Sequence, residues 1–313
     1  MHKLPLTFTP LYQERVWGGR ELETVYNRTL PKDGVPFGES WEITDRPDEQ
    51  SVVSTGALAG KSLHQLWSNQ REEIFGAGFT SERFPLLIKI LDARDDLSIQ
   101  VHPPVELAPE LGGEPKTEMW YVADVAADAN IYVGLKNGTT KESFEKALIE
   151  GTCEEQVHAI APKAGESIHI PSGRIHAIGA GLLIYEIQQN SDTTYRVYDW
   201  NRVGLDGVPR ELHVEESMKC IDFNDFEPEM DSPKGNTIAL CEYYHVQQID
   251  LAASETAGNP EADRFSIVTV VSGEVSDSAG SSYIAGDFMI LPVGADVLTA
   301  KNSARVLITT VPR

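Results

Sequence analysis

Short runs rich in Val, Ile, Tyr and Thr dominate the chain from residue 84 onward, and Gly, Pro, Asn or Asp residues separate one run from the next. Runs of this composition are typical of β-strands. We expect strands over residues 85–91, 119–125, 130–134, 167–170, 182–188 and 194–199. Frequent turns between short strands favour an antiparallel barrel or sandwich over alternating strands and helices. The pattern therefore predicts a mainly β fold.

Helical periodicity interrupts the strands in three places. The clearest pattern begins at Thr139, because Thr139 and Glu142 have the spacing of a capping box and Gly151 stands at the exit. Weaker helical patterns cover residues 62–75 and 213–221. We expect a helix at each of these positions.

A segment without periodicity, residues 223–235, contains two prolines and indicates a linker. A chain of 313 residues is long enough for more than one domain. We therefore expect one domain over residues 1–228, with N-terminal strands and inserted helices, and a second domain over residues 229–313.

An internal repeat relates two segments on either side of this linker. Residues 164–177 read AGESIHIPSGRIHA and residues 285–298 read AGDFMILPVGADVL. Both contain a Gly, five residues, a Pro, one residue and a Gly; these are Gly165, Pro171 and Gly173 in the first copy and Gly286, Pro292 and Gly294 in the second. The glycines and Pro-x-Gly predict tight turns around a strand. The first copy continues to His176, whereas the second has Val297, so we expect a metal ligand in the first copy alone.

The charge balance limits the partners that the protein can bind. The chain has 26 Lys and Arg residues against 48 Asp and Glu residues, a net charge of -22 with neutral histidines. Such a chain repels nucleic acid and anionic membrane surfaces unless a basic cluster offsets the charge, and none is evident in the sequence. We expect no nucleic-acid partner. A site for a phosphorylated metabolite must gather several cations in one pocket.

The three cysteines, Cys153, Cys220 and Cys241, are far apart and form no C-x-x-C pair. They predict neither a disulfide framework nor a thiolate zinc site, and they fit a reducing cytoplasm. The longest apolar run, residues 177–185, is shorter than the roughly 20 residues that a spanning helix needs. Polar residues at 13–15 precede any apolar run that could act as a secretory signal. We expect a soluble cytoplasmic protein.

The first candidate site combines histidines with oxygen ligands. Gln100 and His102 are two residues apart on an extended segment and therefore point to the same side. Glu118 begins an apolar strand, and Lys116 lies two residues before it. With His176 these residues offer a set of imidazole, amide and carboxylate ligands that suits zinc or another divalent first-row ion. Each histidine alone could instead be a satisfied polar residue of a barrel, but the set and the repeat together favour a metal site.

The spacing Gly-x5-Pro-x-Gly-x2-His at residues 165–176 resembles the second motif of the cupin superfamily. Four phrases in chain order resemble the type I phosphomannose isomerases of the short bacterial form: LSIQVHP at 97–103, KTEMWY at 116–121, IPSGRIHA at 170–177 and TTYRVYD at 193–199. The likeness extends from WGG at 17–19 and GESWE at 38–42 to RELH at 210–213 and to the C-terminal repeat. It implies two cupin-like antiparallel β-barrel (jelly-roll) units with a few inserted helices. The first unit would be catalytic and metal-binding, and the second would lack the metal.

The resemblance implies one zinc ion per chain, held by Gln100, His102, Glu118 and His176. It also implies the reversible interconversion of mannose 6-phosphate and fructose 6-phosphate through a zinc-stabilised enediolate, with Arg196 in the active site. Longer members of the family carry a histidine where this chain has Pro115, so any ring-opening role of that histidine does not carry over.

Moving a carbonyl between C1 and C2 requires a group that removes a proton and groups that stabilise negative charge on oxygen. Arg196 and Lys116 are the candidate catalytic residues. Either can serve the enediolate or the phosphate, and Lys116 can act as an acid or base if burial and the metal lower its pKa. Ser98 and Lys89 are candidate substrate-binding residues. The proton-transferring base stays open between Glu186, His169 and a metal-bound water.

Other interpretations remain open at this point. Without the resemblance, Arg196 would be an ordinary cross-strand ion-pair partner, and Lys116 and Lys89 would be lysines at strand ends. A non-catalytic sugar-binding or regulatory metal cupin would keep the same ligands, and a cupin oxygenase would need a redox-active iron. The sequence leaves open whether the protein is a monomer or a homodimer.

Overall fold

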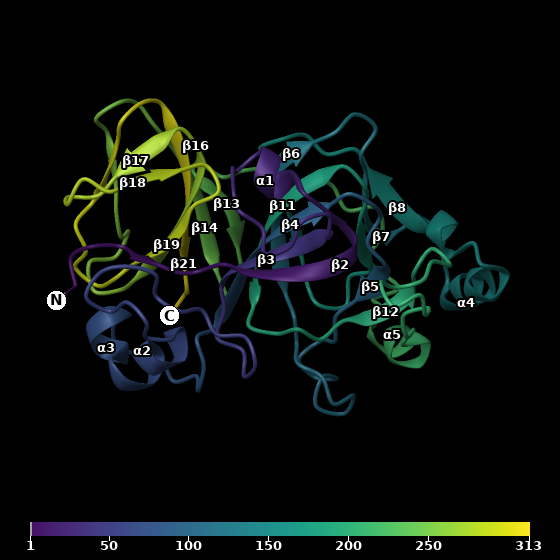
Figure 1. Cartoon of the computed structure of the whole chain (residues 1–313). Helices are drawn as coiled ribbons and strands as arrows, with labels where there is room; N and C mark the ends of the chain where they lie inside the picture. Colours follow the sequence, from purple (N-terminus) through teal and green to yellow (C-terminus); the bar gives the residue numbers. More distant parts are fainter. Residues whose placement is uncertain (1) are drawn as a thin grey trace. The chain divides into compact units, whose positions relative to one another are not determined.

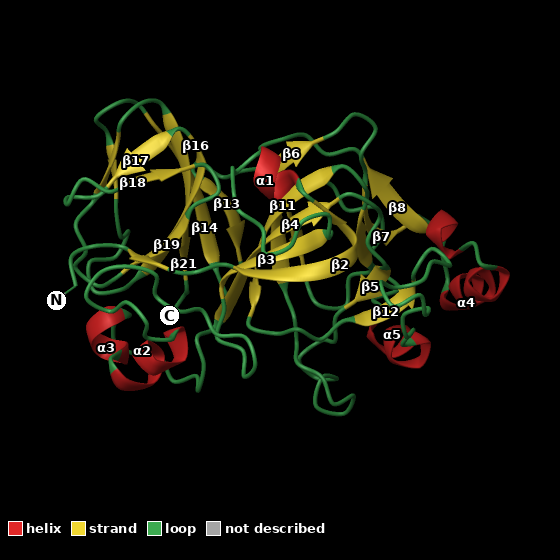
Figure 2. Ribbon diagram, viewed as in Figure 1, coloured by secondary structure: helices red, strands yellow, loops and turns green. Residues whose placement is uncertain are grey.

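The computed structural model describes residues 2–313, and β-strands make up most of its regular structure (Figure 2). The prediction of a mainly β fold is therefore confirmed. The chain forms two compact units. One unit contains the chain up to Leu11, Trp41–Ile88 and Ser232–Arg313; the other contains Tyr12–Ser40 and Lys89–Asp231. No helix within residues 2–313 is long and apolar enough to cross a lipid bilayer.

The unit that includes the C-terminus contains two antiparallel sheets. Its six-stranded sheet has the order β1-β19-β16-β21-β14-β13, with β1 (Leu6–Thr7), β13 (Thr237–Leu240), β14 (His245–Leu251), β16 (Ser266–Ser272), β19 (Phe288–Leu291) and β21 (Ala304–Thr310). Its four-stranded sheet has the order β15-β20-β17-β18, with β15 (Thr256–Ala257), β17 (Glu274–Ser276), β18 (Ser282–Ile284) and β20 (Leu298–Ala300). Side chains of both sheets, among them Val268, Met289 and Leu298, share one buried apolar cluster.

The other unit contains a five-stranded antiparallel sheet in the order β12-β5-β10-β7-β8, with β5 (Ile99–Val101), β7 (Ile131–Leu135), β8 (Val157–Ile160), β10 (His176–Ile178) and β12 (Tyr195–Tyr198). A second sheet has six strands in the order β2-β3-β4-β11-β6-β9, and this unit contains all or part of each of them. The strands are β2 (Leu11–Gly19), β3 (Phe37–Ile43), β4 (Leu86–Ala93), β6 (Glu118–Val125), β9 (Ser167–Ile170) and β11 (Leu182–Gln189). Ile131 and Ile178 from the first sheet share an apolar cluster with Trp120 and Ile184 from the second. The inner faces of the two sheets therefore pack together.

Helices cover the outside of the strands and connect them. They are α1 (Glu21–Thr24), α2 (Leu63–Asn69), α3 (Arg71–Ile74), α4 (Lys141–Glu150), α5 (Val214–Cys220) and the 3-10 helix η1 (Cys153–Gln156). In Figure 1, α5 lies beside β12 and β5, against which it packs. The helix expected over 62–75 is two short helices, because the backbone leaves the helical region at Gln70, which has φ -134° and ψ 27°. The helix expected over 213–221 is confirmed as α5.

The N-terminal cap of α4 differs from the prediction. The helix exists and ends at Gly151, which has φ 74° as a left-handed C-cap. Its N-cap, however, is Thr140 and not Thr139. The Thr140 hydroxyl accepts the N–H of Ser143 at 3.1 Å, and the Ser143 hydroxyl accepts the N–H of Thr140 at 2.9 Å. Thr139 instead places its hydroxyl 3.2 Å from the side-chain oxygen of Gln156.

Replacing Thr140 with alanine is expected to lower the free energy of unfolding by about 1 kcal/mol, because it leaves an N-terminal amide of α4 without its acceptor. Urea unfolding would measure the loss. Lys141→Ala in the same exposed first turn is the control and should change the free energy much less. Equal stability of the Thr140→Ala variant and the wild-type protein would contradict this assignment of the cap.

The two copies of the repeat have the same local structure. Gly165 and Gly286 both have positive φ, 89° and 85°, and each donates its N–H to a strand carbonyl, at 2.8 and 2.9 Å. The strands β9 and β19 follow at the same spacing and lead to the two prolines. After each Pro-x-Gly the next N–H returns to the proline carbonyl, at 3.1 Å from Arg174 and 3.0 Å from Ala295. The repeat is therefore a repeat of turn, strand and turn.

The two copies differ at the residue three positions after the second glycine. His176 begins β10 and is buried, with 1% of its surface exposed. Val297 precedes β20 and is 49% exposed. Residues 223–235 contain neither a helix nor a strand, and the border between the two units falls at Asp231. The division into domains at residues 1–228 and 229–313 stays a prediction.

Candidate metal centre and active site

Strand alternation places the candidate residues on the inner face of the five-stranded sheet. Arg196, Gln100 and His176 form one cross-strand row, since Gln100 is in register with both of the others. Their chain neighbours, such as Val101 and Val197, belong to an apolar cluster that includes residues of α4 and α5. Because successive side chains of a strand point to opposite faces, the row faces the other sheet.

The opposite sheet supplies a second set of inward side chains by the same alternation. Glu118 on β6 precedes Trp120 by two residues, and Glu186 on β11 follows Ile184 by two. Trp120 and Ile184 both lie in the apolar cluster between the sheets. The side chains of the two glutamates therefore point to the same inner face, at the end of the apolar cluster. Polar residues of both sheets meet at this point.

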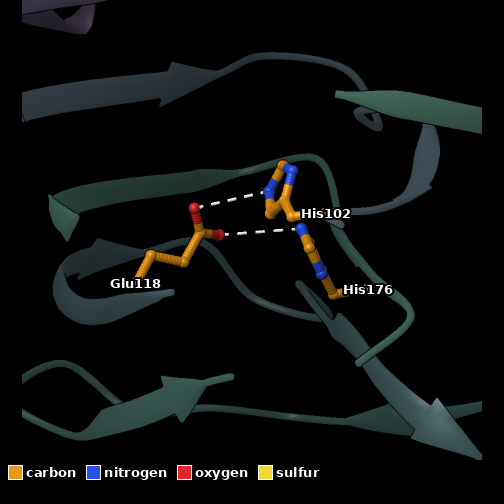
Figure 3. A group of neighbouring side chains, drawn as sticks. All are labelled: His102, Glu118 and His176. Carbon is orange, nitrogen blue, oxygen red and sulfur yellow. Dashed lines mark ion pairs between the residues drawn. The ribbon is translucent and has the colours of Figure 1, made fainter. Parts of the chain in front are cut away.

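Two histidines and a glutamate converge there (Figure 3). Glu118 Oε2 lies 3.5 Å from His102 Nε2, and Glu118 Oε1 lies 3.6 Å from His176 Nε2. All three side chains are buried, and their candidate ligand atoms lie within 4.8 Å of one another. Three of the four residues that the sequence predicted as metal ligands, each from a different segment, are thus brought together.

The second ring nitrogen of each histidine is fixed by the backbone. His102 Nδ1 lies 2.8 Å from the carbonyl oxygen of Thr193, and His176 Nδ1 lies 2.9 Å from that of Arg174. Because a carbonyl only accepts hydrogen bonds, each Nδ1 carries the proton and each Nε2 presents its lone pair to the centre. Burial, with the charge of Lys116, lowers the pKa of His102 to about 3, and burial also lowers the pKa of His176. Both imidazoles are therefore neutral, as metal ligation requires.

The polar atoms of this cluster fit a divalent cation. His102 Nε2 and Glu118 Oε1 are buried and have no hydrogen-bond partner within residues 2–313. A buried polar group left in this state destabilises a protein by about 1–3 kcal/mol. A cation at this point would receive lone pairs from two nitrogens and a carboxylate oxygen, a donor set typical of first-row divalent ions. The cluster of His102, Glu118 and His176 could therefore hold a metal.

Gln100 lies at the edge of the cluster, and its amide nitrogen, not its amide oxygen, faces His176. Its Nε2 lies 3.3 Å from His176 Nε2, and its Oε1 accepts a hydrogen bond of 3.3 Å from the Ser98 hydroxyl. An amide nitrogen with its hydrogens cannot ligate a metal, so rotation of the amide by half a turn is needed to present Oε1 to the centre. The structure brings Gln100 beside His176 without presenting the ligand oxygen.

Lys116 forms an ion pair with the cluster from its edge. Its ammonium lies 2.7 Å from Glu118 Oε2 and 3.7 Å from Glu186 Oε1. Burial alone would lower the pKa of Lys116, but the charges of Glu118 and then Glu186 raise it above its ordinary value. Burial would likewise raise the pKa of Glu118, and the Lys116 charge holds that pKa well below its usual range. In the surroundings that these two carboxylates provide, Lys116 is therefore an ammonium group.

A second lysine continues the ion pairs away from the cluster. Lys89 Nζ lies 3.4 Å from Glu186 Oε1 and 3.6 Å from Glu39 Oε2, and Arg15 Nε donates to Glu39 Oε1 at 2.9 Å. Burial raises the pKa of Glu186, the charge of Glu118 raises it further, and the two lysines oppose this shift. The indole N–H of Trp120 donates to Glu186 Oε2 at 3.1 Å. Glu186 is thus a buried carboxyl, held at both oxygens, whose pKa is raised.

A cavity of about 560 Å³ opens beside these groups. Its walls include the sequence-predicted residues Lys89, Ser98, Gln100, Lys116, Glu186 and Arg196. His169 is not among the lining residues. It is in register with Met119 on β6, so its side chain points to the face of the sheet opposite to that of Glu118 and Trp120. Gln100 and Lys116 line the cavity and also contact the cluster, Gln100 at His176 and Lys116 at Glu118.

Several residues of the cavity wall were not identified as site residues from the sequence. They are Glu14, Arg15, Trp17, Glu39, Asp192, Thr194 and Arg210, together with residues 204–206. The sequence contained a partial indication of three of these residues, because the phrases WGG, GESWE and RELH contain Trp17, Glu39 and Arg210. Those phrases supported the family resemblance, but nothing in their spacing indicated that they share one cavity.

Comparison with known proteins gives a consistent result. Residues 6–133 match the family model of the phosphomannose isomerase type I catalytic domain. The chain is 36% identical to the mannose-6-phosphate isomerase ManA of Bacillus subtilis over 97% of its own length and 98% of the relative's. It is 35% identical to the mannose-6-phosphate isomerase of Streptococcus mutans over 92% of each chain.

The fold agrees with these relationships. The crystal structure of the mannose 6-phosphate isomerase from Bacillus subtilis superimposes with a TM-score of 0.88 at 33% identity, covering 98% of this chain and 99% of that one. A likeness of this extent, in a chain whose predicted ligand residues meet in one buried cluster, confirms the resemblance seen in the sequence. The chain belongs to the type I phosphomannose isomerase family.

Proposed function

We propose that this protein is a mannose-6-phosphate isomerase, which interconverts mannose 6-phosphate and fructose 6-phosphate with zinc as its metal. The observation that carries the proposal is the buried cluster of His102, Glu118 and His176 beside a cavity lined by lysines and arginines. Family membership supports the reaction, since the relatives named above are mannose-6-phosphate isomerases.

The metal would be held by His102, Glu118 and His176, with the Gln100 amide oxygen as a fourth ligand after rotation of the amide. When bound, a zinc ion supplies a Lewis acid that polarises the sugar carbonyl. Two neutral imidazoles with a carboxylate and an amide oxygen support zinc among the first-row ions. The Lys116 ammonium, 2.7 Å from Glu118 Oε2, keeps that carboxylate ionised and available as a ligand.

The proton has to leave one sugar carbon and return to its neighbour. Glu186 is the base we favour, because its carboxyl lies in the cavity wall and its raised pKa brings its two protonation states closer to neutral pH. His169 lacks a place in that wall. The charges of Lys116 and Arg196 stabilise negative charge on the substrate.

The remaining assignments follow from the cavity. Ser98 and Lys89 line it and are proposed to bind the sugar phosphate substrate. The three free cysteines, Cys153, Cys220 and Cys241, support a location in the reducing cytoplasm. The alternative, a sugar-binding or regulatory metal cupin, would have the same metal cluster and would bind sugar phosphates without converting them.

Turnover distinguishes the two functions. The purified metal-loaded protein is incubated with mannose 6-phosphate and, separately, with fructose 6-phosphate, and both sugars are quantified over time. An isomerase brings the two reactions to the same final ratio of products, because a catalyst leaves the equilibrium unchanged. Binding of both sugars without conversion in either direction would favour the binding protein and overturn the proposal.

A further inference from the structure

The carbonyl group that orients His102 belongs to an irregular segment of the chain. Thr193 lies 91 residues from His102 in the sequence, and its carbonyl oxygen lies 2.8 Å from His102 Nδ1. Residues 191–194 form neither a helix nor a strand. The repeated backbone hydrogen bonds of a helix or a sheet therefore do not fix the direction of this carbonyl, and other groups have to hold it.

Ser191 holds the amide side of Thr193. Ser191 is buried, with 1% of its surface exposed. Its hydroxyl accepts the N–H of Thr193 at 3.2 Å and donates to the carbonyl oxygen of Glu114 at 3.1 Å. Because a hydroxyl has a single proton to donate, Glu114 takes that donor and Thr193 supplies the incoming one. The Ser191 hydroxyl thus joins Thr193 to the segment that leads to Lys116.

The Thr193 side chain is fixed to the same segment. Its hydroxyl oxygen accepts the N–H of Glu114 at 3.0 Å. The neighbouring Gly113 approaches so closely that a Cβ atom at this position would lie 2.8 Å from Thr193 Cγ2 and 2.7 Å from the Tyr195 hydroxyl. Atoms this close would overlap, so the contact requires a glycine. Thr193 therefore has little room to turn away from His102.

Gln188, near the end of β11, holds Ser191 from the other side. Gln188 is fully buried, and its Nε2 donates to the carbonyl oxygens of Ser191 and Gln189, at 2.6 and 2.8 Å. An amide nitrogen has two hydrogens, so both of its donors are used. The Ser191 N–H also donates to the Gln189 carbonyl oxygen at 2.7 Å. Ser191 is therefore held at its amide, its carbonyl and its hydroxyl.

We propose that Ser191 and Gln188 are positioning residues of the metal centre. They hold the Thr193 carbonyl and, through it, the orientation and tautomer of His102. Neither residue lines the cavity, and neither is one of the three converging ligand residues. If the carbonyl moves, the His102 ring loses the acceptor of its Nδ1–H, and the other tautomer, with its proton on Nε2, has no lone pair there for a metal.

This inference rests on the metal centre of the proposed function, and it does not depend on which reaction the metal serves. Turnover alone would be an ambiguous readout. Asp192 and Thr194, which flank Thr193, line the cavity, so a change in this loop could also alter contacts with the substrate. Metal affinity and the state of the His102 ring are therefore the quantities to measure.

The test measures the zinc affinity of the full-length chain, by competition with a chelator of known affinity at constant pH. Ser191→Ala removes one hydroxyl oxygen and with it the hydrogen bonds to Thr193 and Glu114. We expect the dissociation constant for zinc to rise about tenfold or more, because loss of a partner behind a ligating histidine typically weakens metal binding about 10- to 100-fold. Gln188→Met keeps a similar volume without the donor and should shift the constant in the same direction.

A matched control separates positioning from stability. Ser266 is also fully buried, and its hydroxyl donates to the side-chain oxygen of Asn259 at 2.7 Å, in the unit that includes the C-terminus. Ser266→Ala therefore removes a buried, hydrogen-bonded hydroxyl that is no part of the metal centre. It should lower the midpoint of thermal unfolding, as Ser191→Ala does, and leave the dissociation constant for zinc unchanged.

The tautomer of His102 gives a second readout that a loss of stability does not move. Nitrogen NMR of the metal-free chain distinguishes a ring with its proton on Nδ1 from one with its proton on Nε2, and His102→Ala assigns the signal by its loss. We expect the Nδ1 tautomer in the wild-type protein and a mixture of both in Ser191→Ala. The signal of His158, on β8, should be the same in both proteins.

Unchanged zinc affinity in both Ser191→Ala and Gln188→Met, or an equal loss in Ser266→Ala, would overturn the inference. Weaker zinc binding with an unchanged His102 tautomer would overturn the route through Thr193. Failure of the proposed function is a separate result. A wild-type protein that binds zinc but never converts mannose 6-phosphate would overturn the isomerase assignment, and the comparison of zinc affinities would still decide the roles of Ser191 and Gln188.

Discussion

Replacing His102 with alanine is expected to abolish stoichiometric metal binding and, with it, isomerisation. The imidazole is buried, its Nδ1 is fixed by the Thr193 carbonyl, and its Nε2 has no partner within the described residues other than the candidate centre. Alanine removes one of three converging ligands and leaves Glu118 and His176 facing an empty volume. We expect kcat/KM to fall by at least about 10³, since a metal contributes several kcal/mol to charge stabilisation.

His158→Ala is the matched control, because His158 lies on β8 outside the cluster. Both variants are analysed for metal content per chain, for kcat/KM and for the midpoint of thermal unfolding. The control should keep its metal and its activity. A His102→Ala protein that is folded, fully loaded with metal and fully active would remove His102 from the metal site.

Arg196→Ala is expected to keep the metal and to lose most of the activity. Its guanidinium lines the cavity and contacts none of the three residues of the metal cluster within residues 2–313. Loss of a charged donor pair to the substrate corresponds to about a hundredfold to a thousandfold fall in kcat/KM. If the arginine binds the phosphate, most of this fall appears as a higher KM.

Arg196→Lys refines the interpretation. Lysine keeps the positive charge but lacks the planar fork, so this variant should recover only part of the lost activity. Near-normal turnover by Arg196→Ala would remove Arg196 from the active site. Loss of metal in Arg196→Ala would instead indicate that Arg196 mainly holds Gln100, its register partner on β5, in place.

Local patterns in the sequence predicted six strands with their bounds, all of which the structure contains, and three helical regions that correspond to α2 with α3, α4 and α5. The strand expected over 167–170 is β9 with the same limits, because turns at Gly165 and Pro171 bound it on both sides. The predicted N-cap of α4 was wrong by one residue, because the capping-box rule prefers Thr139 with Glu142 over Thr140 with Ser143. Two adjacent threonines leave the choice to tertiary contacts, and Thr139 contacts Gln156 instead.

The metal cluster was predictable because its ligands lie in short motifs with internal spacing. The cavity wall was only partly predictable. Arg15 and Glu39 lie on β2 and on β3, and only the strand order brings them to Lys89 on β4. The protonation state of Lys116 also required the structure, because burial and its ion pairs shift its pKa in opposite directions.

The central claim is that a metal held by His102, Glu118 and His176 is required for isomerisation. It is tested most directly by removing the metal with a chelator, dialysing, and returning zinc in measured steps while both bound metal and conversion of mannose 6-phosphate are followed. We predict that activity disappears with the metal, rises in proportion to the zinc bound, and levels off at about one ion per chain. Full isomerisation by protein that retains no metal, or complete reloading without any turnover, would contradict the claim.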